Sequence, residues 1–220
     1  MTLNDNNVTR LVSAMEHCGA LSLLEEESFQ LTPRVLGQLA AFIGLVNEWN
    51  NVAGLVSEGD LALLVENHLV DSISLAPIIK RLGKERGVLL DIGSGGGFPA
   101  VPLKVLLPEL AVLMVERSER KVGFLIKVLG DLGLSQPKVI HGNFSEIYRK
   151  GPVDIITARA VEKGKLLLRQ VTRWMPVGSV FLVQSGLPKG LGPMFHVEHV
   201  QDKWQQQGLR RGEVYLVKRI

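Results

Sequence analysis

The first eighty residues and the rest of the chain carry two different patterns of apolar and polar positions. After Pro33, apolar residues recur at helical spacing as far as Trp49, and this spacing predicts an amphipathic helix with Pro33 in its first turn. The same spacing predicts a second helix over residues 61–70, and Pro77 limits the length of any helix that follows Asp71. The N-terminal part of the chain is therefore predicted to be helical.

From residue 88 onward, short apolar runs alternate with amphipathic stretches, a pattern typical of a parallel α/β fold. The first run is apolar enough to be covered on both faces of a sheet. The predicted strands span residues 88–92, 111–116, 138–141, 153–157, 179–184, 195–200 and 213–218, and the predicted helices lie near residues 99–107, 119–132 and 163–174. Because no long helix separates the last two strands, we expect them to pair antiparallel at the edge of the sheet.

Residues 89–98 are the most informative segment, because a predicted strand there runs into a glycine-rich turn preceded by an acid, Asp91. The three consecutive glycines at positions 95–97 allow a sharp turn and a close approach to a ligand. Phe98 stands where the dinucleotide fingerprint G-x-G-x-x-G has its third glycine, which packs the helix on the strand and turns its N-terminus toward a pyrophosphate. A phenylalanine there favours a ligand without a pyrophosphate, such as S-adenosylmethionine (SAM), whose amino-acid end would suit an acid at position 91.

Glu116 ends the next predicted strand, 19 residues after Gly97. A carboxylate at this point can accept hydrogen bonds from both ribose hydroxyls of an adenosine. Nicotinamide-dependent and SAM-dependent folds share this spacing, so Glu116 alone does not distinguish them. The antiparallel end of the predicted sheet favours a methyltransferase over a dehydrogenase.

Length and composition limit the number of domains and exclude disulfides and cysteine-based zinc clusters. With 220 residues, of which 46% are hydrophobic, the chain suits one domain with an extension, and we place a helical extension at residues 1–82 and a SAM-binding domain at residues 83–220. Cys18 is the only cysteine, so neither an internal disulfide nor a cysteine-based zinc cluster can form. No apolar run reaches the roughly 18 residues of a membrane span, and the N-terminus lacks the pattern of an export signal. We expect a cytoplasmic protein without membrane association.

The net charge of +3 is compatible with a polyanionic partner but does not identify one. Single basic clusters are commonly solvated helix faces. Arg117, Arg120 and Lys121 are more informative, because they follow a predicted strand at the edge where the ligand crevice of an open α/β sheet lies.

Several short motifs occur together along the chain. They are Glu48-Trp49-Asn50-Asn51, His68-Leu-Val-Asp71-Ser72 and Asp91-Ile-Gly-Ser-Gly-Gly-Gly-Phe-Pro99, followed by Lys121, Phe124-Leu125 and Arg159-Ala160. In combination these motifs resemble the bacterial 16S ribosomal RNA guanine-N7 methyltransferase G family, also called glucose-inhibited division protein B. The resemblance covers nearly the whole chain and implies a Rossmann-like class I SAM-dependent methyltransferase sheet, an α/β fold, with an N-terminal helical extension.

The resemblance also implies SAM as the cofactor, and 16S rRNA or the small ribosomal subunit as the partner of a monomeric enzyme without a metal. It places SAM contacts on five residues, to which the glycine turn and the strand pattern add two. The expected cofactor-binding residues are Gly93, Phe98, Phe144, Ser145 and Arg159 from the resemblance, and Gly95 and Glu116 from the turn and the strand. The chain departs from the usual family pattern at four places, which are residues 144–146, Glu116 in place of Asp, Ala100 in place of Gly, and Ser185 where Lys is frequent.

Guanine N7 carries a free lone pair and attacks the sulfonium methyl without losing a proton, so methylation at N7 requires no general base. After the fourth strand the chain has Arg159-Ala160 and lacks the Asn/Asp-Pro-Pro-Tyr element that holds an exocyclic amine, which disfavours adenine-N6 methylation. Cys18 lies far upstream of the sheet, which disfavours the cysteine nucleophile needed for methylation at cytosine C5. We therefore assign no catalytic residue.

Three alternative functions stay open: a SAM-dependent methyltransferase acting on a small molecule, an NAD-dependent oxidoreductase and a non-catalytic RNA-binding module. His68, Asp71 and Ser72 also have three interpretations, because their spacing places them on one helix face whatever they do. They have a structural or capping role, contact RNA, or act directly in catalysis, and the last is disfavoured because the reaction needs no base. Trp49 belongs to the apolar stripe of its helix and is interpreted as a core residue rather than as a platform for a base.

Overall fold

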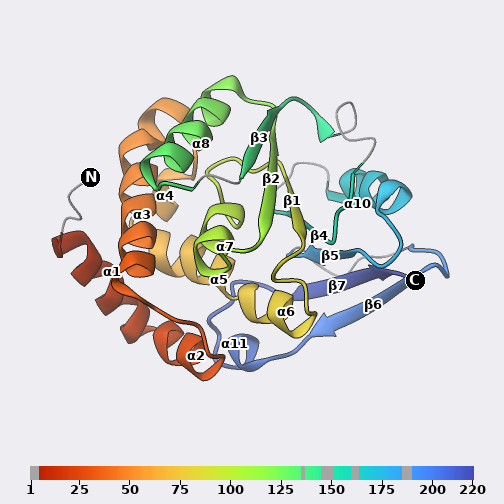
Figure 1. Cartoon of the computed structure of the whole chain (residues 1–220), viewed down its shortest axis with the longest axis horizontal. Coiled ribbons are helices and arrows are strands. Elements are labelled where there is room, and N and C mark those ends of the chain that lie inside the picture. The colour runs from red at the N-terminus through yellow and green to blue at the C-terminus, as the bar shows by residue number, and fades with distance from the viewer. Residues whose placement is uncertain (1–4, 135–136, 145–150, 160–163, 185–189) are drawn as a thin grey trace.

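The computed structural model describes residues 5–134, 137–144, 151–159, 164–184 and 190–220. Its centre is a sheet with helices on both faces, and the N-terminal helices lie along one side of it (Figure 1). The helices are α1 (Asp5–His17), α2 (Ala20–Glu26), α3 (Pro33–Ala53), α4 (Glu58–Leu61), the π-helix η1 (Val65–Val70), α5 (Asp71–Ile73), α6 (Ala76–Arg81), α7 (Ala100–Leu106), α8 (Glu119–Asp131), α10 (Gly164–Trp174) and α11 (Lys203–Gln206). The strands are β1 (Val88–Ile92), β2 (Ala111–Glu116), β3 (Lys138–His141), β4 (Ile155–Ala158), β5 (Val180–Val183), β6 (Phe195–Val200) and β7 (Val214–Arg219).

The seven-stranded sheet has the order β3-β2-β1-β4-β5-β7-β6. Strands β1 to β5 run parallel to one another, and β7 pairs antiparallel with both β5 and β6. This arrangement confirms the predicted α/β fold and the predicted antiparallel pair at the edge, and each strand lies within two residues of its predicted bounds. The sequence order of the strands reverses between β1 and β4, which is the point where open α/β sheets bind ligands.

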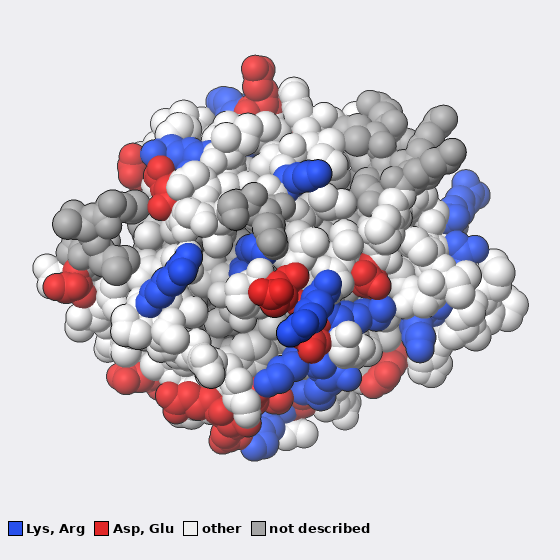
Figure 2. Space-filling model, in the orientation of Figure 1, with Lys and Arg blue, Asp and Glu red and all other residues white. Residues whose placement is uncertain are grey.

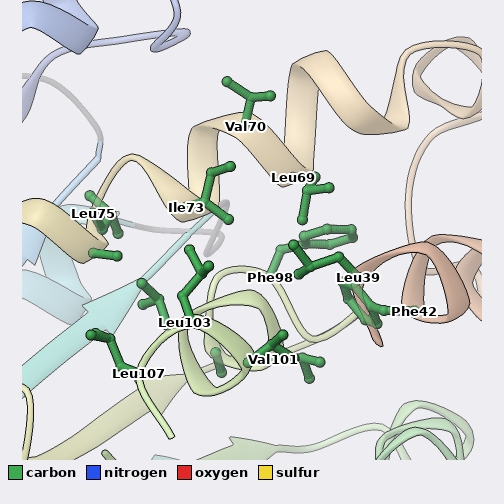
Figure 3. Close-up of a cluster of buried hydrophobic side chains, with 14 of the residues drawn as sticks. Leu39, Phe42, Leu69, Val70, Ile73, Leu75, Phe98, Val101, Leu103 and Leu107 are labelled. Atoms are coloured by element: carbon green, nitrogen blue, oxygen red, sulfur yellow. The ribbon is translucent and has the colours of Figure 1, made fainter. Parts of the chain in front are cut away.

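The sheet is buried on both faces, as its apolar strands predict. Leu89 and Leu90 are adjacent on β1 and therefore point to opposite faces. Leu89 belongs to the larger core cluster, which includes residues of α3, α7 and α8, and Leu90 belongs to a smaller cluster covered by α10. Figure 3 shows part of the larger cluster, where Phe42 of α3, Leu69 of η1 and Val101 of α7 pack together. Burial of each such side chain contributes about 1.5–3 kcal/mol to folding.

Helix α3 begins where the sequence predicts. Thr32 is its N-cap, with a hydroxyl that accepts a hydrogen bond from the Val35 backbone N–H, and Pro33 occupies the first turn. The larger core cluster holds residues of α3 together with residues of the sheet, so the predicted segments 1–82 and 83–220 share one core. The boundary between them stays a prediction.

The prediction of one continuous helix over residues 61–70 is wrong. Helix α4 ends before η1 starts, and α5 follows η1 directly. Contacts between distant parts of the chain accompany this irregular backbone, because the Asp71 carboxylate accepts hydrogen bonds from Arg159 and Gln184, which follow β4 and β5. The spacing of apolar residues contains no sign of these contacts. Short π-helical segments often occur at functional sites.

Candidate cofactor site

The glycine turn follows the carboxyl end of β1, next to the point where the order of the sheet reverses. Gly93 opens the turn, and its N–H donates to the Val115 carbonyl of β2 at 2.8 Å. Gly95 and Gly97 have φ values of 51° and 84°, in the left-handed region that favours glycine. A Cβ on Gly97 would also lie only 2.9 Å from Cγ2 of Val101. Backbone conformation therefore requires glycine at both positions, and packing requires it at Gly97.

Asp91, near the carboxyl end of β1, is 1% exposed. Its Oδ1 accepts a hydrogen bond from the Thr157 hydroxyl of β4 at 2.7 Å, whereas its Oδ2 is buried and has no hydrogen-bond partner among the described residues. Burial raises the pKa of the Asp91 carboxyl to about 6, although hydrogen bonds and the charge of Arg159 act in the opposite direction. A cationic group placed against Oδ2 would satisfy this oxygen and compensate for the buried charge.

Glu116 ends β2 and is 6% exposed. Its Oε2 accepts a hydrogen bond from the Gly95 backbone N–H at 2.9 Å, and its Oε1 accepts one from the Ser118 backbone N–H at 2.8 Å. The carboxylate therefore fixes the glycine turn, a role that the sequence did not predict. Each carboxylate oxygen has a second lone-pair site, so Glu116 can still accept hydrogen bonds from ribose hydroxyls.

Phe98 is 5% exposed and packs against the N-terminal helices. The centroid of its ring lies 4.8 Å from that of Phe42 and 5.3 Å from that of His68. Figure 3 shows Phe98 between Leu69 and Phe42. This packing explains the phenylalanine at the third position of the fingerprint, because the side chain faces the helical layer. A contact between Phe98 and the cofactor stays a prediction.

Arg159 directly follows β4 and forms hydrogen bonds with two side chains of the N-terminal helical region, one in α5 and one in η1. Its Nη1 donates to Oδ2 of Asp71 at 3.3 Å, and its Nη2 donates to Nδ1 of His68. Asp71 also accepts hydrogen bonds from the Gln184 side chain and the Arg211 backbone N–H, and no side chain caps α5. The capping interpretation of Asp71 is therefore wrong. The sequence placed these residues on one helix face but did not reveal that the face meets Arg159.

The remaining predicted residues occupy other parts of the fold. Phe144 is 8% exposed, and its ring lies edge-on to that of Trp174 with a centroid distance of 5.4 Å. Ser145 lies outside the described residues. Trp49 packs against Phe124 of the larger cluster, with ring centroids 6.2 Å apart, which confirms that it is a core residue.

On the face seen in Figure 2, basic and acidic side chains are interspersed and form no continuous basic surface. Some of the exposed charges are paired, as Arg81 is with Glu27 at 3.3 Å. The predicted basic rim lies where β2 leads into α8, with Arg117 and Arg120 exposed and Lys121 half-buried.

Within the described parts of the chain, no group of three or more His, Cys, Asp or Glu side chains is placed to hold a metal ion. None of the helices described is both long enough and apolar enough to cross a membrane.

Two acids flanking a glycine turn, at the switch point of a parallel sheet with an antiparallel final pair, define a class I SAM-dependent methyltransferase. Solved structures share this fold. A mutant of MtNAS in complex with SAM superimposes with a TM-score of 0.57 at 15% identity, covering 100% of this chain and 99% of the other. A protein of Methanococcus maripaludis assigned as a SAM-dependent methyltransferase has a TM-score of 0.55 at 14% identity, covering 80% of this chain and 91% of the other.

Sequence comparison defines the family more closely. Residues 36–214 match the family described as rRNA small subunit methyltransferase G. The ribosomal RNA small subunit methyltransferase G of Leuconostoc citreum is 31% identical over 174 residues, covering 76% of this chain and 71% of the relative. The protein of that name from Streptococcus pyogenes serotype M12 is 32% identical over 163 residues, covering 70% of this chain and 67% of the relative. The chain belongs to the rRNA small subunit methyltransferase G family, as its motifs predict.

The residues around the glycine turn fit SAM, the cofactor of this class of enzymes. The unpartnered Oδ2 of Asp91 suits the ammonium of its amino-acid end. The Gly95 position is open, because a Cβ added there would meet nothing nearer than 3.7 Å, so a ligand can approach the backbone. Glu116 offers acceptors at the end of the neighbouring strand.

Proposed function

We propose that this chain transfers the methyl group of SAM to N7 of a guanine in 16S rRNA. The observation that carries the proposal is the buried, unpartnered Oδ2 of Asp91 beside the glycine turn, in a chain that matches the family over residues 36–214. Family membership supports the rRNA substrate, and the site supports the cofactor. The choice of N7 follows from the family resemblance and from the chemistry that the site offers.

Each part of the cofactor has a proposed partner. Asp91 pairs with the ammonium, Arg159 with the carboxylate, and Glu116 with the ribose hydroxyls. The backbone of Gly93 and Gly95 lines the approach, and Phe144 and Ser145 are proposed to contact the adenine. SAM supplies an electrophilic methyl group on its sulfonium, and the chain's own residues orient that group toward the base.

Side chains at the carboxyl ends of β1 and β4 are held by hydrogen bonds within the protein. Thr157 donates to Asp91, and Arg159 donates to Asp71. Such an arrangement suits a reaction in which the enzyme aligns nitrogen, methyl carbon and sulfur, because N7 has no proton to lose. Alignment of two reactants supplies up to about 7–11 kcal/mol of rate acceleration in favourable cases.

The RNA is proposed to approach along the basic rim formed by Arg117, in the connection after Glu116, and by Arg120 and Lys121, in the first turn of α8. Contacts of this kind bind phosphates without reading sequence. We infer a monomer that acts in the cytoplasm on rRNA, either free or within the small subunit.

The test is methyl transfer from radiolabelled SAM to small ribosomal subunits from cells that lack this gene, followed by mapping of the label and identification of the modified base. N7-methylguanosine at one site is the expected product. Label at another base, or at another atom of guanine, would contradict the proposal. SAM binding without any transfer to rRNA would favour the alternative of a small-molecule acceptor.

A further inference from the structure

Two side chains of the N-terminal helical region, Asp71 of α5 and His68 of η1, hold the Arg159 guanidinium. Asp71 accepts a hydrogen bond from Nη1 and His68 accepts one from Nη2, while the guanidinium carbon lies 5.1 Å from the centroid of the Phe98 ring. The Arg159 side chain is 16% exposed, so it is largely buried but still accessible. A guanidinium has five N–H groups, and these two contacts with described residues leave donors for a ligand.

The hydrogen bond to Arg159 determines the protonation state of His68. Arginine only donates, so Nδ1 of His68 is the acceptor and the ring proton lies on Nε2. Nε2 is buried without a hydrogen-bond partner among the described residues, and Oδ2 of Asp60 lies 3.6 Å from it. Burial, and then the charge of Arg159, lower the pKa of His68 below its ordinary value and keep the ring neutral. Only the neutral ring can accept a hydrogen bond from Arg159.

Asp60 is fixed in front of the opposite edge of this ring. Its Oδ2 accepts a hydrogen bond from the Ser57 hydroxyl at 2.6 Å, and its Oδ1 accepts hydrogen bonds from Asn67 at 2.9 Å and Arg211 at 3.2 Å. The hydrogen bonds from Ser57 and Asn67 lower the pKa of Asp60 to about 2, so the group stays ionised. Its charge faces the Nε2–H of His68 and favours the tautomer in which Nδ1 accepts.

Arg159 and Asp91 lie at the ends of neighbouring strands. Asp91 is in register with Thr157, so Arg159 lies two residues beyond this pair, close to the start of the glycine turn. The charges of Arg159 and Asp91 interact. An α-amino acid group carries an ammonium and a carboxylate on adjacent atoms of one carbon, and these two side chains match the two charges.

We propose that His68 is a positioning residue for the cofactor, because its Nδ1 holds the Arg159 guanidinium over Phe98, from where Arg159 binds the carboxylate of SAM. The inference rests on the proposed function, since it requires SAM as the ligand. Without this acceptor, Arg159 would keep its hydrogen bond to Asp71 but lose the one to His68, and its guanidinium would no longer be fixed in one orientation. The π-helix η1 then contributes to cofactor binding as well as covering the sheet.

Two substitutions separate the aromatic ring of His68 from its acceptor. His68→Phe keeps a ring against Phe98 and removes the acceptor, whereas His68→Asn places an amide oxygen near the position of Nδ1. In calorimetric titrations we expect the Kd for SAM to rise about ten- to hundredfold in His68→Phe, as for the loss of a hydrogen bond to a charged group, and to stay within about threefold in His68→Asn. His196→Asn, at an exposed position of β6, is the matched control and should leave the Kd unchanged. The KM for RNA should be the same in all four proteins.

Protonation of His68 should have the same effect as removal of its acceptor. The titratable and charged groups that face the ring are Arg159, Asp60 and Arg211, and the lowered pKa confines the imidazolium to pH values below the ordinary histidine range. The SAM affinity of the wild type should therefore fall as the pH drops below the ordinary histidine range, and more steeply than that of His68→Asn. Asp91, with a pKa of about 6, titrates in both proteins and cancels in the comparison.

A Kd for SAM in His68→Phe equal to that of the wild type would overturn the inference, as would identical acid limbs in the wild type and His68→Asn. If circular dichroism shows that His68→Phe does not fold, the pH comparison decides alone. A wild-type chain that does not bind SAM, or binds it and methylates no guanine, would instead overturn the proposed function. The two failures are thus distinguishable.

Discussion

Two buried acids of the candidate site have different surroundings. Asp91 on β1 has one oxygen bonded to a hydroxyl of β4 and another without a partner among the described residues. Asp71, at the start of α5, has both oxygens engaged, Oδ2 by Arg159 and Gln184 and Oδ1 by the backbone N–H of Arg211. The two residues are similarly buried, at 1% and 6% exposure, so burial alone does not distinguish them.

An unsatisfied buried oxygen is therefore a better reason to propose a ligand site than charge or burial alone. Buried polar groups in folded proteins nearly always have partners, so an exception calls for a functional explanation. Burial raises the pKa of Asp91 to about 6, which shows that the protein alone does not fully compensate for its charge. The charge of Asp71 is compensated within the protein, where it joins η1 and α5 to the ends of β4 and β5.

The largest loss of SAM affinity is expected from Gly95→Asp, which places a third carboxylate beside Asp91 and Glu116. The Gly95 N–H donates to Glu116, and its φ of 51° favours glycine, so the substitution adds strain as well as repulsion. The new side chain occupies the space through which a ligand approaches the backbone, and repulsion of up to about 4 kcal/mol among the carboxylates displaces the turn, so we expect the Kd for SAM to rise by at least about a hundredfold in calorimetry. Gly123→Asp on α8, where a Cβ meets nothing within 4 Å, is the control. Unchanged affinity in Gly95→Asp would show that the turn does not bind SAM.

Asp91→Asn should produce the next largest loss of SAM affinity. The same substitution should make the SAM-free protein more stable. The amide can still accept from Thr157 but has no charge for an ammonium, so we expect the Kd for SAM to rise about tenfold or more. The Tm without SAM should increase, because the ionised carboxylate of Asp91 opposes folding at neutral pH. Calorimetry and thermal denaturation measure the two effects separately. A decrease in both affinity and Tm would indicate a structural role like that of Asp71.

The raised pKa of Asp91 also gives this stability difference a defined pH dependence. The folded-state pKa of about 6 exceeds the ordinary value of 3.8, so between these values the folded chain keeps a proton that the unfolded chain has lost. The contribution of Asp91 to stability therefore falls as the pH rises from about 4 to about 6. The stability advantage of Asp91→Asn should grow across this window and level off above about pH 7. An advantage independent of pH would mean that Asp91 titrates like an ordinary carboxyl.

Joint replacement of Arg120 and Lys121 by alanine should have a smaller effect, confined to the affinity for RNA. Loss of two phosphate contacts should weaken rRNA binding several-fold and reduce the slope of log Kd against log salt by about 1.4–1.8, while SAM affinity is unchanged. Filter binding at several salt concentrations measures the slope. Arg86 is exposed and lies just before β1, at the amino ends of the parallel strands and away from the rim. Arg86→Ala is the control and should leave the salt slope unchanged. An unaltered slope in the double variant would place the RNA on another surface.

Local patterns in the sequence predict most of the fold and the place of Asp91 before the glycine turn, but not the contacts of Asp71. The strands could be located from apolar runs, and Asp91 from the glycines that follow it. The partners of Asp71 lie 88, 113 and 140 residues away, and no local pattern encodes them. The same reason explains why η1 was predicted as an ordinary helix and why the bond between Glu116 and Gly95, 21 residues apart, was missed. Sequence spacing thus located the strands and the glycine turn but did not reveal hydrogen bonds between residues that are distant in the chain.

The smallest effect on turnover is expected from Asp71→Asn, although stability and SAM affinity should fall. The amide oxygen can accept from Arg159 but no longer compensates for its charge, so the free energy of unfolding should drop by about 1–3 kcal/mol. With SAM and RNA both saturating, we expect kcat to stay within about twofold, because loss of a general base would lower it by about 10²–10⁴ and attack by N7 needs no base. Rapid-quench measurement of the methyl-transfer step separates this constant from product release. A loss of two orders of magnitude would mean that Asp71 accepts a proton during the reaction. The three hydrogen bonds that hold this carboxylate within the protein oppose such a step.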